Sequence, residues 1–540
     1  MNKPKRANKS QRQKASMAPK AHGASKAAVT LSDADIVAAL SQALQQGMAS
    51  DWFEEDAVTQ FAAYLDDCAD PDEADAERVE QIIDLIGALS DLQISCNGGD
   101  RVARKDMQTI HELLDSALDD GSLAPGDLIM MGKILNDAGW GVSERLKTAL
   151  ADAMQGLAQD GPTVGDSDIS SLLPDIAVDD DVTAFEIHEY LLSMTAAFSA
   201  AASGQLLAAL GALPRPELHQ ALVGFVLHRD FEVAQAAGAA LRTLAGRGPV
   251  DGVLIDRLVG MRPWLPSPRQ ADVDATIRVL RPHAGPPQKH EVPKVVDCDV
   301  SVCDGLGTFS IYVSQRLGSV YSLASVMMKA AGVDDVMIIS GLSKSELAEL
   351  QRQMRAAVPT SRSDVAGVAR MLRLALADNA TSGVLPPFRL VEFVEALGLT
   401  PLYAEHASPS ELVEELLAGL PEAETGAAAT AKAYAALLNE EFIENWYEAG
   451  EDLDQVLGQR KGFGARIRAV LTHHLPSRRQ FWARQCAISA LALRGQPRRS
   501  TWQHLAIAGR DLLSNQPLDE IPLMQQIATT SVQVFEAEMQ

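Results

Sequence analysis

Residues Val296–Ser314 have the sequence VDCDVSVCDGLGTFSIYVS, and this stretch decides how the rest of the chain divides. Its hydrophobic residues recur at every second position, which is the period of a β-strand. The glycines of Asp304–Thr308 interrupt the alternation, so the two halves are predicted to form a β-hairpin. The faces predicted to be buried carry Val296, Cys298, Val300 and Val302 in the first strand and Phe309, Ile311 and Val313 in the second.

The opposite face of the first predicted strand is acidic. Asp297 and Asp299 lie on that face, and Asp304 begins the turn. Converging carboxylates are what a ribonuclease-H-like nuclease uses to hold two metal ions, so these three are candidate catalytic residues. The competing interpretation is a solvent-facing strand that carries charge for solubility. We favour that second interpretation and expect no catalytic residues, no bound metal and no cofactor.

The glycines of the predicted turn also invite comparison with a phosphate-binding loop. In a dinucleotide-binding fold a helix follows the glycines, and its N-terminus holds the phosphates. Here Phe309–Val313 predicts a strand instead. A glycine-containing hairpin turn is therefore the favoured interpretation of Gly305 and Gly307.

The hairpin is predicted to open a small α/β domain over residues 292–415. Val320–Met328 is predicted as a third strand or the start of a helix, and Val336–Ile339 as a shorter fourth strand. Ser343 and Glu346 have the spacing of a capping box, which predicts a helix that runs to Ala357. Further helices are expected over Ser363–Ala377 and Leu390–Leu397.

Upstream of the proline-rich boundary Arg281–Lys294, the predicted helices are short and follow one another closely. They cover Leu206–Leu213, Glu217–Leu227 and Phe231–Leu244, a pattern typical of antiparallel helix pairs. The segment FEVAQAAGAALRTLA, which begins at Phe231, resembles a HEAT-type repeat. The resemblance implies a solenoid-like stack of helix pairs and no site.

The fold class expected for the whole chain is predominantly α, with HEAT-like antiparallel helical pairs flanking the small α/β domain. At 540 residues the chain has room for several domains. The predicted parts are a disordered basic arm (1–30), a helical domain (31–161), HEAT-like repeats (182–282), the α/β domain (292–415) and a C-terminal helical domain (426–540).

Charge is unevenly distributed in this acidic chain, whose formal net charge is -25. Asp51–Glu80 contains twelve carboxylates and a single basic residue, Arg78. Gln455–Arg510, here called the acid-free block, contains eleven lysines and arginines and no Asp or Glu. Complete absence of acids over such a length, in a chain that is otherwise rich in acids, is the charge pattern least expected by chance in this sequence.

Three interpretations of the acid-free block remain open. It complements acids elsewhere, on the N-terminal helices or across an oligomer interface; it binds an external polyanion such as nucleic acid; or it is a solvated face. We favour internal complementarity. The candidates for polyanion binding are Arg466, Arg468, His473, His474, Arg478, Arg479 and Arg484, with Trp482 and Trp502 as aromatic residues that either stack on bases or pack between helices.

Composition narrows the class of protein. There is no apolar stretch long enough for a membrane span, and the five scattered cysteines show no metal-binding or disulfide spacing. We therefore expect a cytoplasmic protein without membrane contact. The favoured function is a non-catalytic interaction scaffold that binds a protein partner or itself, although enzymatic activity stays open. The alternative is a nucleic-acid-binding or nucleic-acid-processing protein that uses residues 455–510 and the acidic strand.

Overall fold

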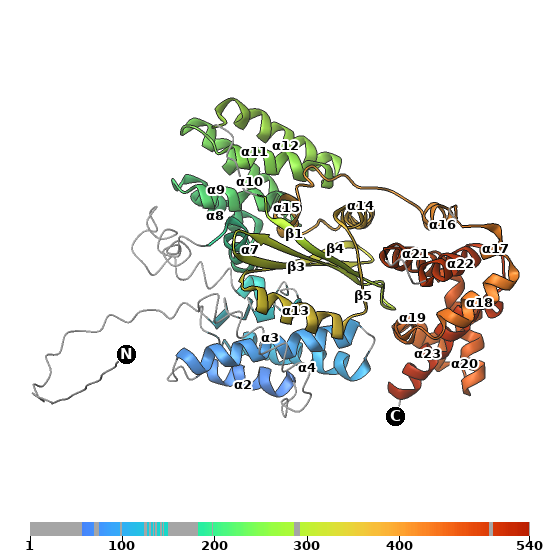
Figure 1. The fold of residues 1–540 in the computed structure, drawn as a ribbon. Helices are drawn as coiled ribbons and strands as arrows, with labels where there is room; N and C mark the ends of the chain where they lie inside the picture. The colour runs from blue at the N-terminus through green and yellow to red at the C-terminus, as the bar shows by residue number, and fades with distance from the viewer. Residues whose placement is uncertain are drawn as a thin grey trace, which may run out of the picture. The chain divides into compact units, whose positions relative to one another are not determined.

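The structure is a computed structural model that describes residues 57–69, 75–97, 100–121, short stretches between 123 and 149, 182–285 except 197, 292–495 except 419, and 500–538. The predicted basic arm, the helix expected to start near Ser32 and the connector at 162–181 lie outside the described residues. Within the described part the protein is predominantly helical, with one small antiparallel sheet (Figure 1). None of its described helices combines the length and hydrophobicity needed to cross a bilayer.

The first described helices surround a hydrophobic core of their own. They are α2 (Ala57–Ala69), α3 (Asp75–Asn97) and α4 (Arg101–Asp120). Phe61, Leu85 and Ile110 contribute one buried side chain from each helix to this core. Asp100 caps α4 by accepting hydrogen bonds from the amides of Val102 and Ala103, and the chain leaves the helix through the left-handed Gly121.

The next six helices pack in two layers (Figure 1). One layer holds α7 (Ala184–Thr195), α9 (Pro216–Gly224) and α11 (Gly252–Met261), and the other holds α8 (Ala200–Ala212), α10 (Phe231–Thr243) and α12 (Ser267–Leu280). Small residues let the helices of the second layer approach closely: a Cβ on Gly211 of α8 would lie 3.3 Å from the Cβ of Ala240 on α10. These helices contain the segments in which the sequence predicted short helices.

The sheet has the strand order β4-β3-β2-β1-β5, with every pairing antiparallel. Its strands are β1 (Lys294–Ser301), β2 (Phe309–Leu317), β3 (Val320–Lys329), β4 (Gly332–Leu342) and β5 (Thr360–Arg362). The predicted hairpin is confirmed, and Phe309, Ile311 and Val313 are buried as expected. Helix α13 (Lys344–Ala357) packs against β3 and β4, and α14 (Val365–Ser382) and α15 (Arg389–Ala396) also pack against β4 (Figure 1). The capping box of Ser343 and Glu346 is formed at the start of α13.

Three details of the sheet differ from the sequence-based expectation. Val296 is 50% exposed instead of buried, because the register of β1 shifts between Val295 and Asp297 at a β-bulge. The fourth strand, expected to be short, extends over eleven residues. Strand β5 was not predicted; it pairs three residues of the chain with β1 after α13.

The C-terminal part is helical, as predicted. Its helices are α16 (Pro409–Leu417), α17 (Glu422–Thr425), α18 (Ala427–Leu437), α19 (Glu451–Gly458), α20 (Phe463–Ala469), α21 (Leu475–Leu493), α22 (Thr501–Leu513) and α23 (Pro522–Glu538). A π-helical turn, Val470–His474, connects α20 directly to α21, so His473 and His474 lie within a continuous helical segment. Pro476 has no backbone N–H to donate, and the wider turn just before it accommodates that loss.

Candidate functional site in the acid-free block

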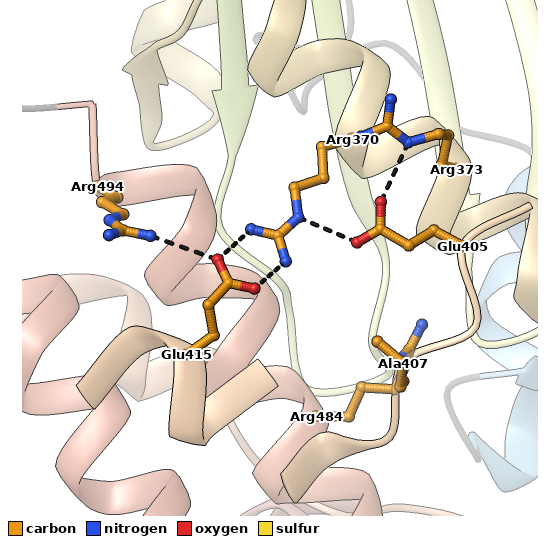
Figure 2. A network of polar contacts seen from close by, with 7 residues as sticks. All are labelled: Arg370, Arg373, Glu405, Ala407, Glu415, Arg484 and Arg494. Carbon is orange, nitrogen blue, oxygen red and sulfur yellow. Dashed lines mark hydrogen bonds and ion pairs between the residues drawn. The ribbon is translucent and has the colours of Figure 1, made fainter. Parts of the chain in front are cut away.

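The arginines of the acid-free block are the most distinctive group of charged residues in the sequence, so their contacts decide what the block can bind. Figure 2 shows a network that Arg494 of the block joins, where α14, the loop before α16, α16 and the end of α21 meet; Arg370 and Arg373 of this network come from α14. Arg370 donates from Nη1 to Oε1 of Glu415 at 2.6 Å, and its Nε donates to Glu405 at 3.3 Å. Arg494, from the block, lies 3.6 Å from the same Oε1 of Glu415. The pKa of Glu415 is lowered, and the largest cause is hydrogen bonding from Arg370.

Arg484 in α21 connects the block to α14. Its Nη2 lies 2.5 Å from Oδ2 of Asp378, and its Nη1 donates to the carbonyl oxygen of Ala407 at 3.4 Å (Figure 2 shows Arg484 and Ala407). Burial raises the pKa of Asp378 although Arg484 lies beside it. The side chain of Arg484 is only 22% exposed, so its guanidinium binds groups within the chain.

A second network surrounds Glu448, a carboxylate that is almost completely buried. Its oxygens accept hydrogen bonds from Trp482 Nε1 at 2.7 Å, from Arg478 Nε at 2.9 and 3.1 Å, and lie 3.2 Å from His474 Nε2. Burial favours the protonated acid, but the hydrogen bonds from His474 and Arg478 outweigh it and hold the pKa of Glu448 below its ordinary value. His474, Arg478 and Trp482, all considered as candidates for contact with a polyanion, therefore contact one internal carboxylate.

Other arginines of the block have internal partners too. Arg466 donates to Glu536 at 2.6 Å, and Arg510 pairs with Asp511 at 2.8 Å. Arg479 donates to the carbonyl oxygens of Leu512, Ser514 and Gln516, where α22 ends. Guanidinium groups at a helix C-terminus satisfy carbonyls that have no partner within the helix.

The cations that remain are at the other end of the block. The side chains of Arg460, Lys461 and Arg468 are exposed and make no hydrogen bond or ion pair with the described residues. His473 is exposed on the π-helical turn. Of the seven candidates for polyanion binding, Arg468 and His473 face solvent, whereas Arg466, His474, Arg478, Arg479 and Arg484 contact the protein itself. Trp482 is buried and Trp502 half-buried, beneath Arg494.

The aspartates of the acidic strand also have internal partners. Nη2 of Arg355, on α13, lies 2.7 Å from Asp297 and 2.6 Å from Asp299, and Arg362 lies 2.9 Å from Asp297. The expectation of a solvent-facing acidic strand was wrong, because Arg355 of α13 pairs with both aspartates and Asp299 is only 4% exposed. Asp304 does not join the pair: it accepts hydrogen bonds from the amides of Leu306 and Thr308 within the turn. No group of acids, histidines or cysteines with metal-binding geometry occurs among the described residues.

The glycines of the turn serve close packing. A Cβ on Gly305 would lie 2.6 Å from the carbonyl oxygen of Asn445, and one on Gly307 would lie 2.4 Å from Nε2 of Gln485. Gly307 also has a positive φ of 86°, which favours glycine. The space beside the turn is thus taken by the C-terminal helical part, which supports the hairpin-turn interpretation over a phosphate loop.

Sequence reasoning found the block but missed its acceptors. Glu415 and Glu448 lie tens of residues away from Arg494 and Arg478 of the block, and Asp378 lies 106 residues from Arg484. No spacing rule links such pairs. The available signal was the total lack of acids inside the block, which requires acceptors from elsewhere if the arginines are buried.

Comparisons with known proteins agree on one group of relatives. Residues 199–283 match the model of the Y4lR second domain, and residues 410–536 match that of the Y4lR C-terminal helical domain. The chain is 25% identical over 365 residues to the uncharacterized protein y4lR of Sinorhizobium fredii. The aligned region covers 65% of this chain and 68% of the relative. No solved structure matches the chain. The two matched ranges contain the helices α8–α12 and most of the C-terminal helical part, including the acid-free block.

Proposed function

We propose that the protein is a non-catalytic interaction scaffold, whose helical surfaces bind a macromolecular partner or a second copy of the chain. The observation that carries this proposal is the two-layer arrangement of the helices between residues 184 and 280. The layer of α7, α9 and α11 contacts the α/β part: Arg257 of α11 binds Glu395 of α15, and His188 of α7 packs edge-on against Phe388. The layer of α8, α10 and α12 lies on the other side of it.

The second layer offers an extended surface of the kind that solenoid proteins use. Stacked helix pairs expose one continuous row of helices, and we interpret this row as HEAT-like. On α10 the exposed positions Glu232, Gln235 and Ala239 follow one another at helical spacing. We propose that these small and polar side chains contribute to the contact with another macromolecule.

The ion pairs of the acidic strand and of the acid-free block argue against the nucleic-acid-processing alternative. A metal ion at Asp297 and Asp299 would have to displace Arg355, and most of the candidate polyanion-binding arginines already bind oxygens of the chain. Arginines engaged in this way hold the α/β part and the C-terminal helices together. Such rigidity is what a scaffold needs in order to present a surface.

The experiment that tests the proposal changes the α10 surface. Gln235→Arg with Ala239→Arg adds two bulky cations there, and Ala348→Arg with Ala356→Arg adds two at exposed positions of α13 as the matched control. Tagged full-length chains are compared by sedimentation velocity and by quantitative mass spectrometry of co-purified proteins. We expect the α10 variant to lose self-association or specific co-purified proteins that the control retains. Identical results for the wild type and both variants would overturn the proposed surface.

A further inference from the structure

Three cations of the acid-free block that lie close together in the sequence are exposed and make no hydrogen bond or ion pair with the described residues. They are Arg460 and Lys461, between α19 and α20, and Arg468, in α20. The other described arginines of the block bind carboxylates or carbonyl oxygens within the chain. Together with Phe463, whose side chain is 39% exposed, these three cations are called here the α20 patch.

The local backbone brings the members of the α20 patch together. Gly462 has a φ of 88°, so the chain turns sharply at the start of α20 and leaves Arg460 and Lys461 beside its first turn. The guanidinium of Arg468 reaches back toward that turn, because Nη1 lies 3.8 Å from the position of a Cβ on Gly464. Phe463, between these two glycines in the sequence, is exposed at the start of α20.

The chemistry of the α20 patch selects an occupant that carries carboxylates and apolar groups together. Three unpaired cations attract a segment of high negative charge, and the exposed ring of Phe463 favours a segment with hydrophobic side chains. Nucleic acid is the less favoured occupant. Three cations neutralise about three phosphates, which gives weak binding.

The sequence itself contains a segment with these properties. Asp51–Glu80 combines twelve carboxylates with the aromatic residues Trp52 and Phe53, and has a single basic residue. The acid-free block is its counterpart, since it contains no acid at all. A chain with both features is complementary to another copy of itself, and such heterologous contacts generate closed rings or open assemblies.

We propose that the α20 patch docks the acidic segment Asp51–Glu80 of a second copy of this chain. This inference rests on the proposed scaffold function and names the partner of one surface. The α20 patch is separate from the α10 surface, so the two are tested with different variants. A negative result for one surface does not contradict the proposal for the other.

The test reverses charge on each side of the contact in the full-length chain. The patch variant is Arg460→Glu with Lys461→Glu and Arg468→Glu; the segment variant is Asp66→Lys with Asp67→Lys and Asp70→Lys. Lys294→Glu with Lys344→Glu and Lys432→Glu is the control for the patch variant, because these lysines are exposed and the net charge changes equally. Melting temperatures are compared first, and the exposed patch residues are expected to leave them unchanged.

Sedimentation velocity of the wild type is expected to show self-association at micromolar concentration. The patch variant is expected to weaken it at least tenfold, the control less than twofold, and an equimolar mixture of patch and segment variants is expected to regain a mixed complex. A labelled synthetic peptide of residues 51–80 is expected to bind the wild type and not the patch variant. A monomeric wild type, equal association in the patch variant, or patch-dependent binding of a single-stranded RNA oligonucleotide in place of the peptide would each overturn the proposal.

Discussion

The indole nitrogen of Trp482 donates a hydrogen bond of 2.7 Å to the carboxylate of Glu448, and both side chains are buried. Trp482 comes from α21, whereas Glu448 lies in the segment before α19. The ring of Trp446 lies 5.4 Å from that of Trp482, and its own indole donates to the carbonyl oxygen of Cys303, two residues beyond the end of β1. The contact between Trp482 and Glu448 therefore belongs to a chain of buried interactions that joins the sheet to the C-terminal helices.

Replacing Glu448 tests how much this junction stabilises the fold. Glu448→Gln keeps the size of the side chain but removes the charge that Arg478 and His474 face, so we expect a loss of about 2–4 kcal/mol in the free energy of unfolding. Urea unfolding followed by tryptophan fluorescence measures it. Glu444→Gln, at an exposed position of the same segment, is the control and is expected to change stability by less than about 0.5 kcal/mol. Equal unfolding midpoints for the two variants would contradict the role given to Glu448.

Glu392, on α15, makes stability depend on pH. Burial, with Glu186 and Glu189 nearby, raises its pKa to about 7 against the lowering effect of Arg389. The folded state then binds the proton more tightly than the unfolded state, whose glutamate has a pKa of about 4.3. Its stabilising contribution is therefore fully present below about pH 4.3 and is lost as the pH rises toward 7.

Glu392→Gln, which imitates the protonated acid, is expected to leave stability near pH 4.5 almost unchanged and to raise it by about 1–3 kcal/mol at pH 8. Urea unfolding at the two pH values measures the change. Glu395→Gln on the same helix is the control with the opposite sign at pH 8, since it breaks the paired hydrogen bonds to Arg257. A Glu392→Gln effect that does not vary with pH would show that this carboxylate is ionised throughout.

The turn between β1 and β2 is tested by adding a methyl group. Gly305→Ala places a Cβ 2.6 Å from the carbonyl oxygen of Asn445, so backbone must move, and we expect destabilisation of about 1–3 kcal/mol. Gly246→Ala is the matched control, because nothing lies within 4 Å of its Cβ. The measurement is the difference in thermal unfolding by differential scanning calorimetry. Unchanged thermal stability of the Gly305→Ala variant would contradict this close packing and would favour a phosphate-binding turn.

Arg370 and Arg494 share Glu415 but in different geometries (Figure 2). Arg370 is 23% exposed and binds both oxygens of the carboxylate, whereas Arg494 is 45% exposed and lies at 3.6 Å. Lysine cannot reproduce a two-pronged contact, so Arg370→Lys is expected to cost about 1–2 kcal/mol and Arg494→Lys less than about 0.5 kcal/mol. Chemical unfolding of both variants at low and high salt checks the order; the reverse order would contradict it.

The sequence by itself determined the local structure of much of the described chain. Alternation at Phe309, Ile311 and Val313 predicts a strand because side chains of a strand point to opposite faces, and the structure buries all three. The capping box of Ser343 and Glu346 involves residues three apart, so it too is readable without a fold. Helix period and proline positions located the short helices before the sheet for the same reason.

Only the tertiary structure decided what the charged residues do. The acid-free block is visible as a composition, but whether Arg478 faces solvent or a buried Glu448 depends on how helices distant in sequence pack. The same holds for Asp299. The alternating pattern assigns it to the solvent face, whereas in the folded chain Arg355 of α13 pairs with it. Periodicity specifies which side of an element a residue lies on, and the neighbour that covers that side is set by long-range packing, for which a single sequence has no local signal.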